Sequence, residues 1–228
     1  MNNIENNLAT VQSQIQQAAL KSNRSNANIL LLAVSKTKPL TDIEQAYHYG
    51  QRHFGESYLQ EAETKIITTV HEDLVWHFIG PIQSNKTKRI SELFDWVHSV
   101  DRMKVATRLN QNRPTDLPPL NILLQVNIDN EESKAGIQLD EIKSMAQSIV
   151  ELPNLQLRGL MAIPKRNDDP EQQRIPFVRM RRALQELQIT YPQCDTLSMG
   201  MSNDLQTAIA EGSTLVRIGT AIFGTRLT

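Results

Sequence analysis

The sequence predicts an α/β protein built as a single (β/α)8 TIM barrel with an extra N-terminal helix. Eight short apolar segments alternate with helical patterns along the 228 residues, at about 25 residues per unit, which a βα repeat can hold. Eight parallel strands are the number that closes such a barrel. A doubly wound open sheet is the competing fold, and the absence of Gly-x-Gly-x-x-Gly after the first apolar segment disfavours it.

The chain opens on an amphipathic pattern, with apolar residues at spacings of three and four from Ile4 through Ile15 to Ala19. We assign residues 1–24 to this helix and residues 29–224 to the barrel, so that residues 1–228 form one domain. The predicted strands are 29–34, 52–56, 74–80, 94–100, 120–128, 155–163, 195–200 and 214–223. The predicted helices are 40–50, 57–70, 85–94, 102–112, 139–152, 171–187 and 202–212.

Local signals mark several ends of these helices. Thr41, Asp101 and Ser202 are expected at helix N-termini, because their side chains can accept hydrogen bonds from free backbone N–H groups. Gly50 and Gly212 are expected after helix C-termini, where the chain often turns with a positive φ.

Composition excludes several classes of function. Lysine and arginine number 24 against 25 acidic residues, a net charge of -1, so nothing indicates a nucleic-acid partner. No stretch approaches the ~20 apolar residues of a membrane span, and the N-terminus has no signal-peptide core. The single cysteine, Cys194, is expected to pack before a strand rather than act as a nucleophile. We expect a cytoplasmic protein with no membrane partner.

The first predicted strand runs straight into a lysine. Residues 29–34 are all apolar, which is typical of a strand buried on both faces of a parallel sheet. Lys36 follows at the carboxyl end of that strand, the end at which barrels carry their active sites. Removal from water makes a lysine amine a better nucleophile, so Lys36 is a candidate for covalent chemistry.

The segments after the last two predicted strands favour an anion. The sequence MGMSND places Gly200 and Ser202 at a helix start, where free N–H groups attract negative charge. The sequence RIGTAIFG places Gly219 and Thr220 at the same height on the next strand. Either segment alone is better explained as a cap or a turn. Together, across the barrel mouth from a lysine, they predict a phosphate site.

A lysine amine and a phosphate site together predict a Schiff base with a phosphorylated aldehyde. Pyridoxal 5′-phosphate (PLP) and the sugar phosphate of an aldolase both fit. Arg217 favours PLP, because it precedes Gly219 by two residues and its guanidinium can donate a hydrogen bond to an aromatic nitrogen. A guanidinium stays protonated, so the pyridine nitrogen it faces would stay unprotonated. The alternative for Arg217 is a structural ion pair inside the barrel.

These segments, in this order, resemble the YggS/PROSC family of PLP homeostasis proteins. The resemblance is carried almost end to end by AVSKTKP, HFGESYLQE, WHFIGPIQSNK, HSVD, VNIDNEESKAGI, LRGLMAIP, LSMGMSND and GSTLVRIGTAIFG. It implies a barrel similar to the N-terminal domain of alanine racemase (fold type III), with PLP held as an internal aldimine on Lys36. It implies cofactor contacts from Lys36, Met201, Ser202, Arg217, Gly219 and Thr220.

The sequence departs from the family at two positions. Ser57 replaces the asparagine of the usual FGENY, and Pro81 stands where a histidine is common. Serine is shorter than asparagine, so Ser57 is the least supported of the predicted cofactor contacts. Lys38 and Lys134 lie near the predicted mouth as candidate second amines. The five histidines show no metal-ligand spacing, and His77 is expected to pack within its strand.

The resemblance implies a PLP-binding protein that buffers or delivers its cofactor in intracellular PLP homeostasis and is not an enzyme. The alternatives are a PLP-dependent amino-acid racemase, a sugar-phosphate aldolase, and an interaction protein whose bound PLP reports vitamin B6 status. Racemases of this fold take a second base from a tyrosine on a further C-terminal domain, and this sequence ends at Thr228, so racemisation is not expected. PLP-dependent apoenzymes are the candidate recipients, and a monomer is expected.

Overall fold

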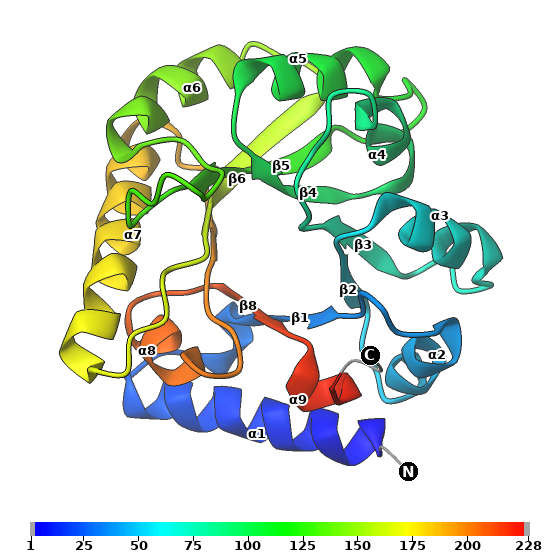
Figure 1. Ribbon diagram of the computed structural model, residues 1–228, viewed down its shortest axis with the longest axis vertical. Helices are drawn as coiled ribbons and strands as arrows, with labels where there is room; N and C mark the ends of the chain where they lie inside the picture. Colours follow the sequence, from blue (N-terminus) through cyan, green and yellow to red (C-terminus); the bar gives the residue numbers. More distant parts are fainter. Residues whose placement is uncertain (1–2, 226–228) are drawn as a thin grey trace.

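The eight predicted strands pair as one closed parallel barrel in the computed structural model, which describes residues 3–225. Strand order follows chain order from β1 to β8, and β8 closes onto β1 by pairing Leu215 with Leu30 and Ile218 with Ala33. The helices lie outside this ring of strands (Figure 1). The barrel prediction is therefore confirmed, and the doubly wound sheet is excluded.

The elements alternate strictly after the N-terminal helix. The strands are β1 (Leu30–Val34), β2 (His53–Glu56), β3 (Val75–Phe78), β4 (Trp96–Val100), β5 (Leu120–Val126), β6 (Leu155–Ala162), β7 (Thr196–Ser198) and β8 (Leu215–Ile218). The helices are α1 (Ile4–Lys21), α2 (Leu40–His48), α3 (Leu59–Thr68), α4 (Thr87–Leu93), α5 (Met103–Asn112), α6 (Ile142–Ile149), α7 (Pro170–Thr190), α8 (Leu205–Ala210) and α9 (Thr220–Phe223), with 3-10 turns η1 (Asn26–Asn28) and η2 (Leu139–Glu141).

The last predicted strand, 214–223, is wrong in its second half. Only residues up to Ile218 form β8, and α9 begins at Thr220. Apolar residues continue through both elements, so hydrophobicity alone could not separate the strand from the short helix. The chain changes conformation at Gly219, which forms the N-cap of α9.

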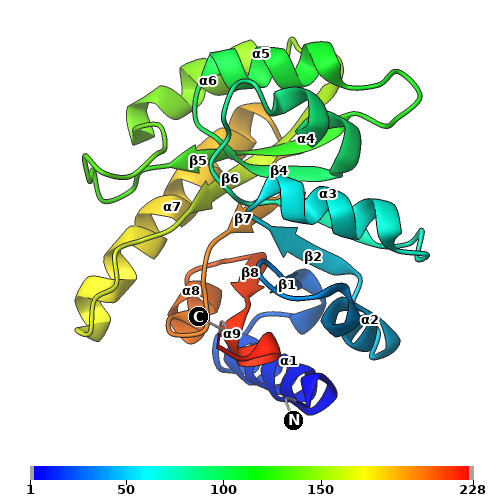
Figure 2. The same ribbon diagram turned by 45° about the vertical axis from the view of Figure 1, so that its right-hand side comes forward.

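Helix α1 packs on the outside of the barrel, next to the place where the last strand, β8, pairs with the first strand, β1. Its buried stripe, from Ile4 through Leu8 to Ile15, is the predicted one. The helix contacts α2, α8 and α9, and both views show it running along α8 and α9 (Figures 1 and 2). Asn3 caps its start by accepting from the Asn6 N–H at 3.0 Å.

The predicted helix caps are wrong at three starts. The N-cap residues of α2, α5 and α8 are Pro39, Arg102 and Asp204, and none makes a side-chain capping bond. The side chain of Asp101, a predicted cap, accepts from Arg102 Nη1 instead. The side chain of Asp204, the observed N-cap residue of α8, accepts from the Met201 N–H. The glycine prediction is confirmed, since Gly50 and Gly212 follow α2 and α8 with φ near +97°.

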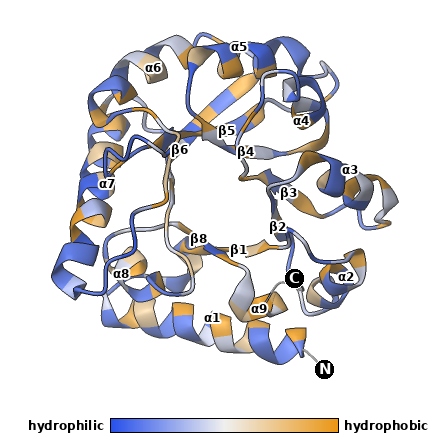
Figure 3. Cartoon of the chain, in the orientation of Figure 1, coloured by the Kyte–Doolittle hydropathy of each residue, from blue (hydrophilic) through white to orange (hydrophobic). Residues whose placement is uncertain are grey.

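The strands and the inner faces of the helices form a continuous apolar core. Figure 3 shows hydrophobic residues along the strands and hydrophilic residues on the outer helix faces. Phe54, Ile122 and Leu160 are fully buried members of this core. Among residues 3–225, no helix has the length and apolar character that a membrane crossing requires.

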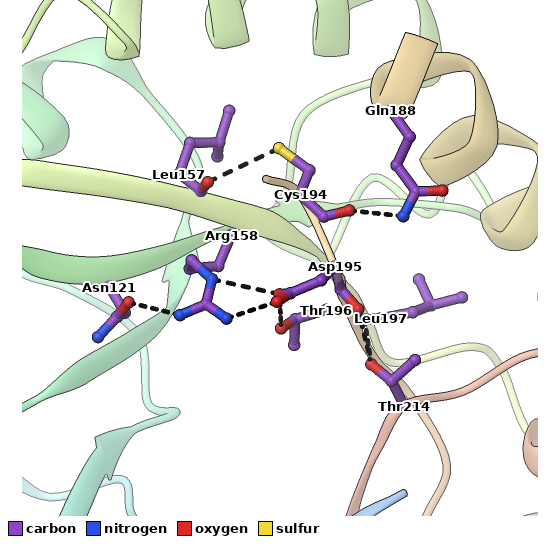
Figure 4. Close-up of polar contacts among 9 residues, drawn as sticks. All are labelled: Asn121, Leu157, Arg158, Gln188, Cys194, Asp195, Thr196, Leu197 and Thr214. Carbon is purple, nitrogen blue, oxygen red and sulfur yellow. Dashed lines mark hydrogen bonds and ion pairs between the residues drawn. The ribbon is translucent and has the colours of Figure 1, made fainter. Parts of the chain in front are cut away.

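The amino ends of β6 and β7 are joined by a polar cluster (Figure 4). Arg158 donates to the Asp195 carboxylate at 2.6 Å and to Asn121 Oδ1 at 3.1 Å. Cys194 lies beside this cluster, fully buried, and burial raises the pKa of its thiol to about 12. A buried, protonated thiol is a poor nucleophile, which supports the predicted packing role.

We expect Gly159→Ala to disrupt the pairing of β6 with β7. A Cβ at this position would lie 1.9 Å from the Thr196 carbonyl oxygen, and φ is +145°. The free energy of unfolding should fall by about 4 kcal/mol or more, measured by urea denaturation.

Gly50→Ala is the matched control. Gly50 has φ +97°, and no described atom lies within 4 Å of the Cβ that would be added. The substitution should lower the free energy of unfolding by about 1–2 kcal/mol, which is the cost of placing an alanine in the left-handed conformation. Equal losses at the two glycines would contradict the close approach at Gly159.

Candidate functional site

Lys36 lies in the turn directly after β1, as predicted, and is half-buried. The start of α9 comes close to the same strand end. A Cβ on Gly219 would lie 3.1 Å from the Val34 carbonyl oxygen, so a side chain there would crowd β1. The absence of a side chain lets the backbone before α9 approach the segment that carries Lys36.

A cavity of about 730 Å³ opens between the loops after β6, β7 and β8. Three predicted contacts line it: Met201, Ser202 and Thr220. Thr220 and Ala221 belong to the first turn of α9, where backbone N–H groups have no acceptor within the helix. The cations Lys165 and Arg166 and the carboxylates Asp168 and Asp204 also belong to the lining. The first turn of α9 is the part of this wall that suits an anionic group.

Ser202 is an exposed residue of a turn, and α8 begins only at Leu205. Asp204 Oδ1 accepts from the Met201 N–H at 2.5 Å, which ties the turn together. Desolvation raises the pKa of Asp204, and the Met201 N–H and the charge of Arg217 oppose the rise. Ser202 thus lines the cavity without serving as the N-cap of α8.

Arg217 is buried on β8, with 5% of its surface exposed. Its Nη1 donates to Ser198 Oγ at 2.7 Å and its Nη2 to the Ala162 carbonyl at 2.9 Å. No ion pair among residues 3–225 includes Arg217, so a structural ion pair is not its role. Burial lowers the pKa of Arg217 to about 10, and Asp204 opposes the fall. The guanidinium stays protonated at neutral pH.

A chain of three histidines crosses the barrel interior and ends at Arg217. His53 Nδ1 lies 2.9 Å from His77 Nε2, and His77 Nδ1 lies 2.9 Å from His98 Nε2. His98 Nδ1 lies 3.0 Å from Ser198 Oγ. His77 is packed within its strand, as predicted. The signal overlooked in the sequence is that consecutive strands each carry one histidine.

The direction of hydrogen bonding along this chain follows from Arg217. Arg217 donates to Ser198 Oγ, and His98 is the acceptor left for the Ser198 hydroxyl hydrogen among the described residues. Burial lowers the pKa of His77 and of His98 well below the usual value. Each ring is therefore neutral and has one N–H. His98 must then donate to His77, and His77 to His53.

The remaining predicted residues lie apart from the cavity lining. Ser57 follows β2, and its carbonyl would lie 2.2 Å from a Cβ on Gly80. Lys38 Nζ donates to the Thr225 carbonyl at 2.8 Å. Lys134 Nζ lies 2.5 Å from a Glu131 carboxylate oxygen. A cofactor contact by Ser57, and a role for Lys38 or Lys134 as a second amine, stay predictions.

A buried group of charges beneath Lys36 was also overlooked in the sequence. Lys65 Nζ contacts both Glu56 and Glu61, and it is buried in the strand–helix unit next to β1. In the sequence, nothing distinguishes Lys65 from the other polar residues of the predicted amphipathic helix 57–70. Only the pairing of β1 with β2 brings Glu56 beside Ser35.

The sequence matches the family described as the alanine racemase N-terminal domain over residues 2–227. It is 52% identical to the pyridoxal phosphate homeostasis protein of Escherichia coli K12, over 99% of this chain and 98% of that one. It is 51% identical to the corresponding protein of Pseudomonas aeruginosa, over 99% and 97%. The chain belongs to this family. The resemblance to the YggS/PROSC proteins is confirmed.

Solved structures agree with the fold. PipY of Synechococcus elongatus, solved with PLP bound, is 37% identical, with a TM-score of 0.84 over 97% of this chain and 100% of that one. Alanine racemase of Corynebacterium glutamicum is 16% identical, with a TM-score of 0.73 over 98% of this chain and 61% of that one. The similarity to alanine racemase shows a common fold only, because the sequence identity is low.

We expect the buried histidines to make stability depend on pH. Their pKa is lowered in the folded state, so below about pH 6.5 the unfolded chain binds protons that the folded chain does not. The free energy of unfolding should therefore fall as the pH falls, by up to about 1.4 kcal/mol per pH unit for each buried histidine. Urea denaturation between pH 7 and pH 5 measures this slope.

His98→Gln should remove about one histidine's share of that slope, because it keeps a hydrogen-bonding side chain but no longer titrates. His53→Gln, at the half-buried end of the chain, should remove less. Parallel slopes in the wild type and in His98→Gln would show that His98 does not stay neutral in the folded protein.

Proposed function

We propose that the protein binds PLP and serves PLP homeostasis by holding and releasing the cofactor. The observation that carries this proposal is Arg217, a buried cation with no acidic partner in an ion pair among residues 3–225. It stands on β8, the strand that leads into the hydroxyl-lined cavity at Thr220. A guanidinium has five N–H donors, of which Ser198 and the Ala162 carbonyl accept two, and a pyridine nitrogen would accept another.

The residues present fit PLP. Lys36 would hold the aldehyde carbon through its amine nitrogen, as a C=N bond formed with loss of one water. Ser202 and Thr220 would donate to the phosphate, with Met201 and the backbone at Gly219 beside it. Hydrogen bonds to a charged group are worth about 1.5–3 kcal/mol each. Arg217 would donate to the ring nitrogen. Ser57 is proposed only as an additional contact.

We propose that the protein is not an efficient enzyme. PLP supplies an electron sink when it is bound, and a donor that stays protonated, as Arg217 does, leaves the ring nitrogen unprotonated and the sink weak. The curated relatives carry the name homeostasis protein. The proposed recipients are PLP-dependent apoenzymes. A single-domain monomer in the cytoplasm completes the proposal, and the buried thiol of Cys194 suits a reducing compartment.

Borohydride reduction tests the covalent contact. Purified protein loaded with PLP should be yellow, and reduction should fix the cofactor on Lys36, identified by peptide mass spectrometry. Lys36→Ala should lose the label but keep measurable PLP affinity, because the phosphate contacts remain. A label on another lysine, or none, would overturn the role of Lys36.

Pyridoxal, which lacks the phosphate, is the control ligand. It should bind the wild type weaker by at least about 100-fold in a fluorescence titration, since several charge-assisted hydrogen bonds are lost. Gly219→Val should weaken PLP binding, because a side chain would crowd the backbone near Val34. Equal affinity for the two ligands would refute the phosphate site.

Incubation with amino acids separates release from catalysis. We expect L-alanine and other amino acids to draw PLP from the protein, followed by absorbance after rapid filtration, with no change of chirality on the timescale of an enzyme. Turnover at about 1 s⁻¹ or faster, the low end for ordinary enzymes, and its loss in Lys36→Ala would establish an enzyme instead.

A further inference from the structure

The turn that carries Lys36 is held on both sides by one ion cluster, made of the buried residues Lys65 and Glu56 and the half-buried Glu61. Lys65 Nζ lies 2.7 Å from Glu56 Oε1 and 2.6 Å from Glu61 Oε1. Glu56 is the last residue of β2, while Glu61 and Lys65 lie one turn apart on α3. The cluster therefore joins the strand next to β1 to the helix that follows it.

The residue before Lys36 is held by two members of this cluster. Ser35 Oγ donates to Glu56 Oε1 at 2.7 Å, and the Ser35 carbonyl accepts from Lys65 Nζ at 2.9 Å. Ser35 and Glu56 are fully buried, and Lys65 has 6% of its surface exposed. Water therefore competes little for these bonds.

The residue after Lys36 is held by the third member. The Thr37 N–H donates to Glu61 Oε1 at 2.6 Å, the same oxygen that contacts Lys65 Nζ. Thr37 has φ +63°, a conformation that a β-branched residue rarely adopts. Such a conformation persists only where the surroundings hold it. Two described contacts hold this conformation: the bond from the Thr37 N–H to Glu61, and the bond from the Lys38 N–H to the Ser35 carbonyl at 3.0 Å, which closes the turn around Lys36 and Thr37.

Burial of these charges is costly, which argues for a purpose beyond stability. Ions lose their hydration when they are buried, and a buried ion pair often stabilises a protein little more than apolar residues of similar volume would. Burial raises the pKa of Glu56, opposed by Lys65 and then by Ser35. One Glu56 oxygen, Oε2, has no hydrogen-bond partner among the described residues. The best-supported use of such a group is to fix one conformation.

We propose that Lys65 is a positioning residue for Lys36. By holding Glu56 and Glu61 it fixes Ser35 and Thr37, and thereby the backbone from which the Lys36 side chain extends. The inference rests on the proposed attachment of PLP to Lys36. A misplacement of about 1 Å can slow a reaction about 100-fold, so loss of the cluster should slow covalent capture while the phosphate contacts stay intact.

Glu61→Ala and Glu63→Ala form a matched pair for the test. Both glutamates lie on α3, they are 28% and 34% exposed, and each accepts from a cation, Lys65 or Arg89. Only Glu61 contacts the turn at Thr37. Glu61→Ala should slow the absorbance change on mixing with PLP by about 10- to 100-fold, and Glu63→Ala should not. Equal rates in the two variants would overturn the proposal.

Lys65→Met extends the test to the centre of the cluster. Placed in the Lys36→Ala background it should leave PLP affinity unchanged, whereas with Lys36 present it should slow capture at least as much as Glu61→Ala. Lys65→Arg, which keeps the charge, should restore part of the rate. A loss of affinity equal in both backgrounds would show a general structural defect, and it would overturn the proposal.

Two rates measured on the protein without PLP test this inference separately from the proposed function. In the protein without PLP, Glu61→Ala should change the rate at which acetic anhydride labels Lys36, and it should speed hydrogen exchange at the Thr37 amide, relative to Glu63→Ala. If wild-type protein is not trapped at Lys36 by borohydride, the proposed function fails, but these two rates still decide the inference. No difference in either rate between the variants would overturn it.

Discussion

The pairing of β8 with β1 is the constraint on which the site depends. The first and last strands of the barrel are joined by four residue pairs, which run from Leu30 with Leu215 to Ala33 with Ile218. The chain leaving β1 then reaches Lys36 within two residues, and the chain leaving β8 reaches α9 at the same edge. Helix α1 covers this junction from outside by packing on α8 and α9 (Figure 2). Segments that are far apart in the sequence thus lie at one edge of the barrel.

The charge inside the barrel explains the state of its other polar groups. Arg217 is protonated and buried, and its positive charge helps to lower the pKa of His98 after the larger effect of burial. A second buried cation beside it would be repelled, so the neutral form of the histidine is favoured. Arg217 thereby sets the direction of the hydrogen bonds along the chain that ends at His53, and burial is the main reason that the three rings are neutral. A polar interior of this kind is tolerated because nearly every donor finds an acceptor.

The sequence predicted what depends on periodicity and on strand ends. The barrel, the outer helix, the position of Lys36 and the cavity lining of Met201, Ser202 and Thr220 are all present. The helix-cap predictions failed because α2, α5 and α8 begin one or two residues away from the predicted caps, with Pro39, Arg102 and Asp204 at their N-cap positions. The histidine chain and the Lys65 cluster were overlooked for a different reason. Their members are separated in sequence and meet through the register of neighbouring strands.

The two ends of the proposed cofactor site differ in rigidity, which bears on whether the protein retains or releases its ligand. Arg217 is fixed by buried hydrogen bonds, and the turn at Lys36 is fixed by the ion cluster. Met201, Ser202 and Thr220 are exposed. Water can replace the hydrogen bonds of a phosphate at an exposed wall, and so release there is less costly than from an enclosed one. Efficient enzymes instead exclude water from the reacting group. A rigid interior joined to an open phosphate wall therefore suits reversible holding of PLP better than its use in turnover.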